Sequence, residues 1–165
     1  MNKTYYIFRH GETFATKKGN GIYWLKIFSA PILEEGKPSL LKLAKYLKNV
    51  PSDFNVASPF LRCQQTAELV TSITGKKFDS DARIREYTLE LPWRFKRRVL
   101  HFMQDMEKSE YQHIVICTHS IVIEMLVQYL LKGKIHLRER IISPLPGVLT
   151  IVANKKSEVI NFNEV

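Results

Sequence analysis

Two histidines and two arginines stand where strands of this sequence are expected to end or to lead into a helix, namely Arg9, His10, Arg62 and His119. Guanidinium groups bind the oxygens of a phosphoryl group through paired N–H donors, and an imidazole can attack phosphorus or donate a proton. The four side chains therefore suit phosphoryl chemistry if the fold brings them to one place. Taken singly they have structural alternatives: a strand-capping pair, a surface ion pair and a satisfied core histidine.

The elements that must position these residues alternate between strands and helices. Apolar runs of about four to six residues are separated by longer stretches of helical period, which is typical of β-α-β units. Strands are expected at Thr4–Phe8, Phe54–Ala57, Ile114–Cys117, Gly147–Ala153 and Glu158–Phe162. The pattern predicts an α/β fold, a three-layer α/β/α sandwich with a mainly parallel central sheet, in one domain over residues 1–165.

Helices are expected between these strands, beginning near Pro38, Ser58, Pro92 and Ile121. Ser58 is predicted to cap the second of them, with Pro59 as its first residue, so that Arg62 lies in the first turn. A helix N-terminus favours an anion because its backbone N–H groups lack partners.

The carboxyl ends of parallel strands form the edge at which open α/β sheets bind ligands. Arg9 and His10 follow the first expected strand, and His119 follows the strand that ends at Cys117. Gly11 is expected to let the backbone turn sharply behind His10. We therefore expect one polar site at this edge.

Five segments resemble, in order, motifs of the histidine phosphatase superfamily, which includes the cofactor-dependent phosphoglycerate mutases. They are Arg9-His10-Gly11-Glu12-Thr13, the turn Leu33–Gly36, Ala57–Ala67, Ile84-Arg85-Glu86 and Val115–His119. A lone R-H-G triplet is a weak motif, whereas ordered matches across nearly the whole chain are specific. The resemblance implies a phosphoglycerate mutase-like fold.

The resemblance also implies a two-step mechanism without metal or cofactor. His10 would attack phosphorus and become a phosphohistidine, while Arg9, Arg62 and His119 hold the equatorial oxygens. Glu86 would protonate the leaving alkoxide and then deprotonate the hydrolytic water. The predicted catalytic residues are thus His10, Glu86 and His119, with Arg9 and Arg62 binding the phosphate.

The attacking nitrogen of His10 must be unprotonated, and we expect nearby arginines to lower its pKa by like-charge repulsion. The other ring nitrogen needs an acceptor, for which the Gly11 carbonyl is a candidate. Glu12 and Glu90 are neighbouring carboxylates that compete with Glu86 for the role of general acid. Ser120 stands where the family usually has glycine.

The composition of this 165-residue chain limits the classes of molecule that it is expected to bind. Its 25 Lys and Arg against 16 Asp and Glu give a net charge of +9, which favours an anionic partner. Without an aromatic-interleaved basic motif or a recognition-helix pattern, no nucleic-acid partner is expected. Cys63 and Cys117 lack C-x-x-C companions, and no apolar stretch suits a signal peptide or a membrane span, which predicts a cytoplasmic protein without a membrane partner.

Two further segments are basic. Arg94, Arg97 and Arg98 share one face of the helix that begins at Pro92, for which a solvated basic face is expected and a role in guiding substrate is the alternative. The stretch Thr16–Leu33 has no clear periodicity, and such a loop is often functional in a compact domain.

The sequence therefore predicts a metal-independent phosphomonoesterase of the histidine acid phosphatase type, acting on a phosphorylated small molecule. The stretch between Glu86 and His119 is shorter than in mutases, which favours a compact phosphatase. The alternatives are a protein phosphohistidine phosphatase, an active mutase, and a catalytically weak relative that binds nucleic acid or another anion. A cysteine-based phosphatase is excluded, because Leu69 and Ile123 occupy the positions where it needs an arginine.

Overall fold

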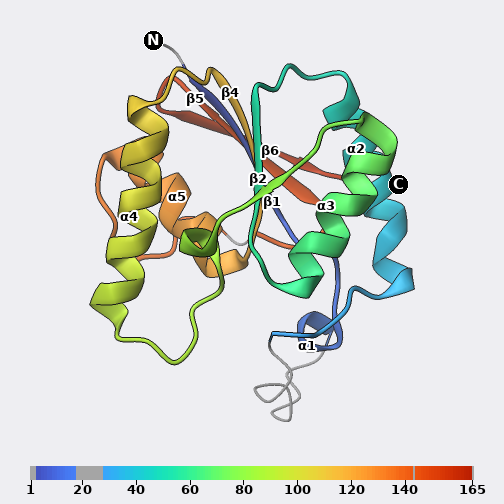
Figure 1. Ribbon diagram of the computed structural model, residues 1–165, viewed down its shortest axis with the longest axis horizontal. Helices are drawn as coiled ribbons and strands as arrows, with labels where there is room; N and C mark the ends of the chain where they lie inside the picture. Colours follow the sequence, from blue (N-terminus) through green and yellow to red (C-terminus); the bar gives the residue numbers. More distant parts are fainter. Residues whose placement is uncertain (1–2, 18–27, 143, 165) are drawn as a thin grey trace.

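A computed structural model describes residues 3–17, 28–142 and 144–164. These residues contain a six-stranded sheet of order β3-β2-β4-β1-β5-β6 (Figure 1). The strands are β1 (Thr4–Arg9), β2 (Phe54–Ala57), β3 (Asp79–Ser80), β4 (His113–Thr118), β5 (Val148–Ala153) and β6 (Lys156–Asn161). The first four in this spatial order are parallel neighbours, and β5 and β6 pair antiparallel. The predicted mainly parallel sheet is confirmed.

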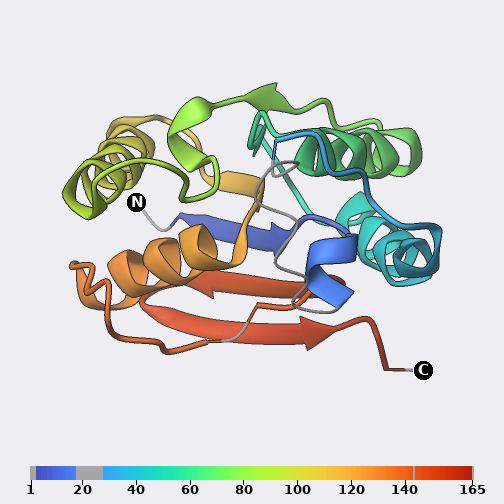
Figure 2. The ribbon, with the colours of Figure 1, turned by 90° about the horizontal axis from the view of Figure 1, so that it is seen from below.

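Helices lie on both faces of the sheet, as Figure 2 shows. They are α1 (Phe14–Lys17), α2 (Lys37–Lys48), α3 (Leu61–Thr74), α4 (Pro92–Lys108) and α5 (Ser120–Lys132), with 3-10 turns η2 (Glu34–Gly36) and η3 (Ala82–Ile84). The pair α2 and α3 packs on one face, and α4 and α5 pack on the other. The predicted α/β/α sandwich is therefore confirmed.

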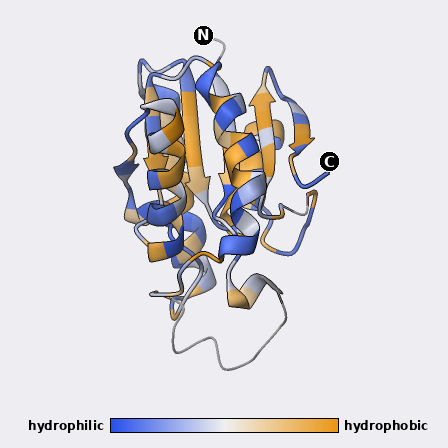
Figure 3. Ribbon diagram, turned by 90° about the vertical axis from the view of Figure 1, so that its right-hand side faces the viewer, coloured by the Kyte–Doolittle hydropathy of each residue, from blue (hydrophilic) through white to orange (hydrophobic). Residues whose placement is uncertain are grey.

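Strand β1 supplies side chains to both hydrophobic cores. Tyr5 and Ile7 pack with α4 and α5, whereas Tyr6 and Phe8 pack with α2 and α3. Successive side chains of a strand point to opposite faces, so a strand with helices on both sides is apolar throughout. Figure 3 shows this distribution, with the hydrophobic colour on the central strands and polar colour on the outer helix surfaces.

Helix α3 begins later than the sequence indicated. Its first residue is Leu61, and its N-cap is Phe60, in an extended conformation and without a side-chain capping bond. The predictions that Ser58 caps this helix and that Pro59 opens it are wrong, because the Ser58 hydroxyl instead contacts a histidine of the site. Arg62 still lies in the first turn, as predicted.

The sequence analysis did not predict two short elements, β3 and α1, and the turn between β5 and β6 is shorter than expected. Strand β3 has only two exposed polar residues, and α1 has a single turn, so neither carries a periodic signal. Strand β6 begins at Lys156, because the turn needs only Asn154 and Lys155, both at positive φ as in a two-residue hairpin.

Residues 18–27, most of the predicted Thr16–Leu33 loop, lie outside the described residues. Among the helices that are described, none is both long and apolar enough to span a membrane.

Candidate active site

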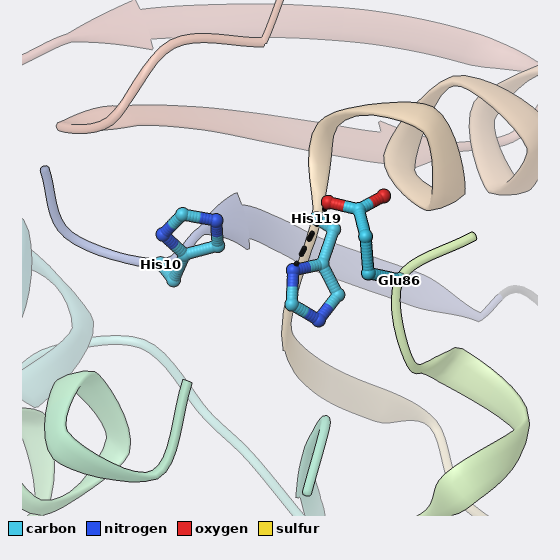
Figure 4. A group of neighbouring side chains, drawn as sticks. All are labelled: His10, Glu86 and His119. Atoms are coloured by element: carbon cyan, nitrogen blue, oxygen red, sulfur yellow. Dashed lines mark ion pairs between the residues drawn. The ribbon is translucent and has the colours of Figure 1, made fainter. Parts of the chain in front are cut away.

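The five predicted site residues lie together at the carboxyl edge of the sheet. Arg9 ends β1, and His10 and His119 directly follow the adjacent parallel strands β1 and β4. Arg62 comes from the first turn of α3, and Glu86 comes from the segment behind η3. The two imidazole rings are 5.1 Å apart between centroids, and Glu86 reaches His119 from the other side (Figure 4).

The hydrogen bonds of His10 fix its tautomer. Nδ1 lies 2.8 Å from the Gly11 carbonyl oxygen, which can only accept, so Nδ1 carries the proton and donates. Nε2 therefore keeps its lone pair, to which Arg62 Nε donates at 3.0 Å. The Gly11 carbonyl is thus the acceptor that the sequence suggested.

The pKa of His10 is well below its ordinary value. Burial is the largest cause, and the positive charges of Arg62 and Arg9 add to it, while the bond to Gly11 opposes it. The expected like-charge repulsion is present, but desolvation of the ring matters more. Both causes keep the Nε2 lone pair unprotonated.

Gly11 is needed for space rather than for a turn. Its φ is not positive, in contrast to the expectation of a sharp turn. A Cβ at this position would lie 2.7 Å from Leu40 Cδ1 and 3.1 Å from Ile32 Cγ2, both closer than ordinary packing. The Gly11 N–H donates to Thr66 Oγ1 at 2.9 Å, which fixes the backbone beside His10.

His119 is held on two sides. Its Nδ1 lies 3.1 Å from Arg62 Nη2, which can only donate, and 3.4 Å from Glu86 Oε2. Nδ1 is thus the acceptor and Nε2 carries the proton, which it donates to Ser58 Oγ at 2.7 Å. Burial first, then His10 and Arg62, hold the His119 pKa well below its ordinary value.

Arg62 and Arg9 provide the positive charge of the site. Arg62 is 5% exposed, and its Nη2 lies 3.6 Å from Glu86 Oε2 in addition to its contacts with both histidines. Arg9 donates from Nη1 to the Pro144 carbonyl at 3.3 Å, while its buried Nε has no hydrogen-bond partner within the described residues. An anion in the site would find donors on both side chains.

The cavity between these side chains is small. It measures about 110 Å³ and is lined by Arg9, His10, Thr13, Ala15, Thr16, Ala30, Arg62 and Glu86. Arg9 and Thr16 also line a larger hollow of about 460 Å³ against α2 and the end of β6. Ser120 begins α5 and is not among the lining residues of the described chain.

The pKa of Glu86 is raised, in contrast to those of the histidines. Burial is the largest cause, and it is opposed by Arg62, by the bond from the Tyr87 N–H, and by Arg9 and Arg98. A carboxyl group that retains its proton beside a phosphoryl site can act as an acid.

Arg98 is not part of a solvated basic face, and that prediction is wrong for this residue. Its side chain is 11% exposed and lies between α4 and the segment that carries Glu86. Arg94 and Arg97 are exposed as expected, with their guanidinium groups against the ring of Trp93. The prediction failed for Arg98 because helical periodicity does not show which loop packs on a helix.

Three residues around the site were not singled out for chemistry by the sequence analysis: Ser58, Thr66 and Thr118. Ser58, Thr66 and Thr118 lie within the segments that carry the family resemblance, and this was the signal that could have identified them. Glu90, an alternative acid from the sequence, and Arg98 lie outside these segments, and only the packed structure shows that they pair with each other beside Glu86.

The ligand atoms of His10, Glu86 and His119 lie within 4.8 Å of one another, a group that by residue type suits a metal ion. However, Arg62 donates to both histidines and faces the carboxylate. Because a guanidinium keeps its charge, a dication among these atoms would face a fixed positive charge at hydrogen-bond distance. The donor set therefore fits an anion better than a metal.

A family model for the histidine phosphatase superfamily (branch 1) matches residues 5–94 and 89–162. By sequence, no curated protein matches the chain. Many solved structures are similar in fold, and three of them illustrate the similarity. An Escherichia coli protein described as a candidate α-ribazole-5′-P phosphatase has a TM-score of 0.76 at 19% identity, over 96% of each chain.

The protein histidine phosphatase SixA, complexed with tungstate, has a TM-score of 0.65 at 18% identity, over 95% of this chain and 94% of its own. A phosphoglycerate mutase from Bacillus anthracis has a TM-score of 0.69 at 14% identity, over 98% of this chain and 94% of its own. The TM-scores show that these proteins share the fold of this chain, and at such low sequence identities they show the fold alone.

Proposed function

Because the chain belongs to the histidine phosphatase superfamily, we propose that it hydrolyses a phosphomonoester of a small molecule, without a metal ion, through a phosphohistidine at His10. The observation that carries the proposal is the state of the His10 ring. Its Nδ1 is occupied by the Gly11 carbonyl, and its Nε2 presents a lone pair beside Arg62. This is the arrangement that a nitrogen nucleophile needs next to a bound anion.

In the first step, the phosphoryl group of the substrate enters the cavity and takes over the N–H donors of Arg62 and Arg9. Release of Arg62 Nε frees the lone pair of His10 Nε2. The Nε2–P bond forms while the bond from phosphorus to the substrate oxygen breaks, and the departing oxygen takes the proton of the Glu86 carboxyl group. The arginines stabilise the charge on the equatorial oxygens.

In the second step, the Glu86 carboxylate removes a proton from a water molecule. The water oxygen bonds to phosphorus, the Nε2–P bond breaks, and inorganic phosphate leaves. His10 is again neutral and Glu86 is again protonated, so the cycle closes. His119 gains a proton more readily when a dianionic phosphoryl group is present, since an opposite charge favours the imidazolium form.

The first experiment is hydrolysis of p-nitrophenyl phosphate in the presence of EDTA. Wild-type protein should turn over, His10→Ala should lose the activity, and a rapid quench should trap an acid-labile phosphoenzyme that is missing in the variant. His101→Ala, an exposed histidine on α4, is the matched control. Loss of wild-type turnover in EDTA, or a fully active His10→Ala, would contradict the proposal.

A protein phosphohistidine phosphatase is the second candidate. Three large apolar side chains stand exposed in the stretch that follows Glu86: Leu89 is 98% exposed, Leu91 53% and Trp93 52%. Exposed apolar side chains near a site suit a protein substrate. The 460 Å³ hollow beside Arg9 instead offers room for the remainder of a small molecule.

A substrate panel separates these candidates. It should contain phosphorylated sugars, nucleotides, phosphoglycerates and phosphohistidine-containing protein, each compared by kcat/KM. A preference for the protein would favour the second candidate. Salt-sensitive binding of DNA or RNA without any hydrolysis would instead indicate the catalytically weak relative.

A further inference from the structure

One guanidinium group of α4, that of Arg98, binds three backbone carbonyls of the segment that carries Glu86. Arg98 Nη1 donates to the Arg83 carbonyl at 2.6 Å and to the Arg85 carbonyl at 2.8 Å, and Nη2 donates to the Glu86 carbonyl at 3.0 Å. These carbonyls lie outside the sheet ladder and need donors. One planar side chain therefore fixes the backbone immediately before and at Glu86.

Glu90 completes the environment of Arg98. Its two carboxylate oxygens both lie 3.1 Å from Arg98 Nε, and the side chains are only 12% and 11% exposed. A largely buried guanidinium needs such a partner, because an unpaired charge at this depth is destabilising. Pairing with Glu90 also reduces the field that Arg98 exerts on Glu86. The main effect of Arg98 is therefore on position rather than on charge.

The opposite side of the same segment is held from β4. Thr118 Oγ1 donates to the Ile84 carbonyl at 2.6 Å, directly before His119. Arg98 itself is not among the residues that line the phosphoryl cavity. The phosphate-binding arginines and the Glu86 segment thus depend on different supports.

We propose that Arg98, held by Glu90, is a positioning residue that aims the Glu86 carboxyl group at the leaving-group oxygen and takes no part in binding the phosphoryl group. The inference rests on the proposed function of Glu86 as general acid. Lysine cannot replace Arg98, because an ammonium group cannot reach three carbonyls and a carboxylate in the fixed directions of a guanidinium.

The test compares esters that differ in their need for an acid. Phenyl phosphate has a poor leaving group that must be protonated, whereas 2,4-dinitrophenyl phosphate departs without protonation. The ratio kcat/KM reports only the steps up to departure of the alcohol, so it isolates the acid function of Glu86 from its later function as base. Arg98→Lys should lower kcat/KM for phenyl phosphate about tenfold, which is a fraction of the rate enhancement that general acid catalysis usually contributes. For the dinitrophenyl ester the loss should be less than about twofold.

Three accompanying measurements define the result. Glu86→Gln should show the same selectivity with a larger loss, inhibition by vanadate should be unchanged in Arg98→Lys, and Arg138→Lys, an exposed arginine, should resemble wild type. If Arg98→Lys does not fold, Glu90→Gln loosens the same guanidinium and should give the same selectivity.

Equal losses on both esters, or no loss on either, would overturn the role of Arg98. If Glu86→Gln and Arg98→Lys each lower kcat/KM equally for both esters, Glu86 is not the general acid, and the inference about Arg98 is wrong as well. If Glu86→Gln is selective and Arg98→Lys is not, only the inference about Arg98 is wrong.

Discussion

At the scale of single residues, the site depends on which nitrogen of each imidazole holds a proton. The two histidines are oriented oppositely: His10 donates from Nδ1 to a backbone carbonyl, and His119 donates from Nε2 to Ser58. Each ring thus presents its unprotonated nitrogen to Arg62. The oxygen acceptors therefore define the site as much as the histidines themselves.

Replacement of Ser58 by alanine tests this dependence. The variant leaves the buried His119 N–H without its hydroxyl acceptor, which should lower the free energy of unfolding by roughly 1–3 kcal/mol. It should also lower kcat/KM, because the ring is free to change tautomer. Urea unfolding and steady-state kinetics measure the two effects, with Ser72→Ala on the exposed side of α3 as the control. Wild-type values for both quantities in Ser58→Ala would contradict the assignment.

The opposite pKa shifts of His10 and Glu86 predict the pH dependence. His10 must be unprotonated, so its lowered pKa moves the acidic limb of kcat/KM below the ordinary histidine value. Glu86 must be protonated, so its raised pKa moves the alkaline limb above the ordinary glutamate value. The result is a bell-shaped profile, after correction for ionisation of the substrate.

Glu86→Gln provides the check on this profile. It should remove the alkaline limb and leave the acidic limb in place, because only the carboxyl group titrates there. An alkaline limb that persists in Glu86→Gln would assign that ionisation to another group.

At the scale of elements, α4 carries buried and exposed arginines on the same side. Arg98 binds the segment that carries Glu86, whereas Arg94 and Arg97 are exposed to solvent. Helix α4 leads into β4, so its first turns lie at the same edge of the sheet as the site (Figure 1). Arg94 and Arg97 have no acidic partner in the described part of the chain and add to the positive field there.

Neutralising this exposed pair tests whether the field guides substrate. The variant Arg94→Gln/Arg97→Gln should lower kcat/KM more at about 10 mM salt than at 1 M. Charges act over a Debye length of roughly 30 Å at the lower salt concentration and of only about 3 Å at the higher one. The control Lys45→Gln/Lys48→Gln removes the same charge near the far end of α2. Equal losses at both salt concentrations would count against guidance by charge.

At the scale of the whole molecule, the sequence was sufficient for the layers and for the edge that carries the site. Strands such as Thr4–Phe8 are buried on both faces and are therefore apolar throughout, which makes them visible. The start of α3 was misplaced because Ser58 resembles a cap and is used by His119 instead. The support from Arg98 and Glu90 was not predictable, since it depends on which loop packs against α4.

The order of the sheet has a consequence for how the chain behaves among other copies of itself. Its two outermost strands are β3, with only two residues, and β6, which carries Lys156 and Glu158. Short or charged border strands discourage a neighbouring molecule from extending the ladder of backbone hydrogen bonds. Both outermost strands thus oppose aggregation by strand pairing between molecules at high protein concentration.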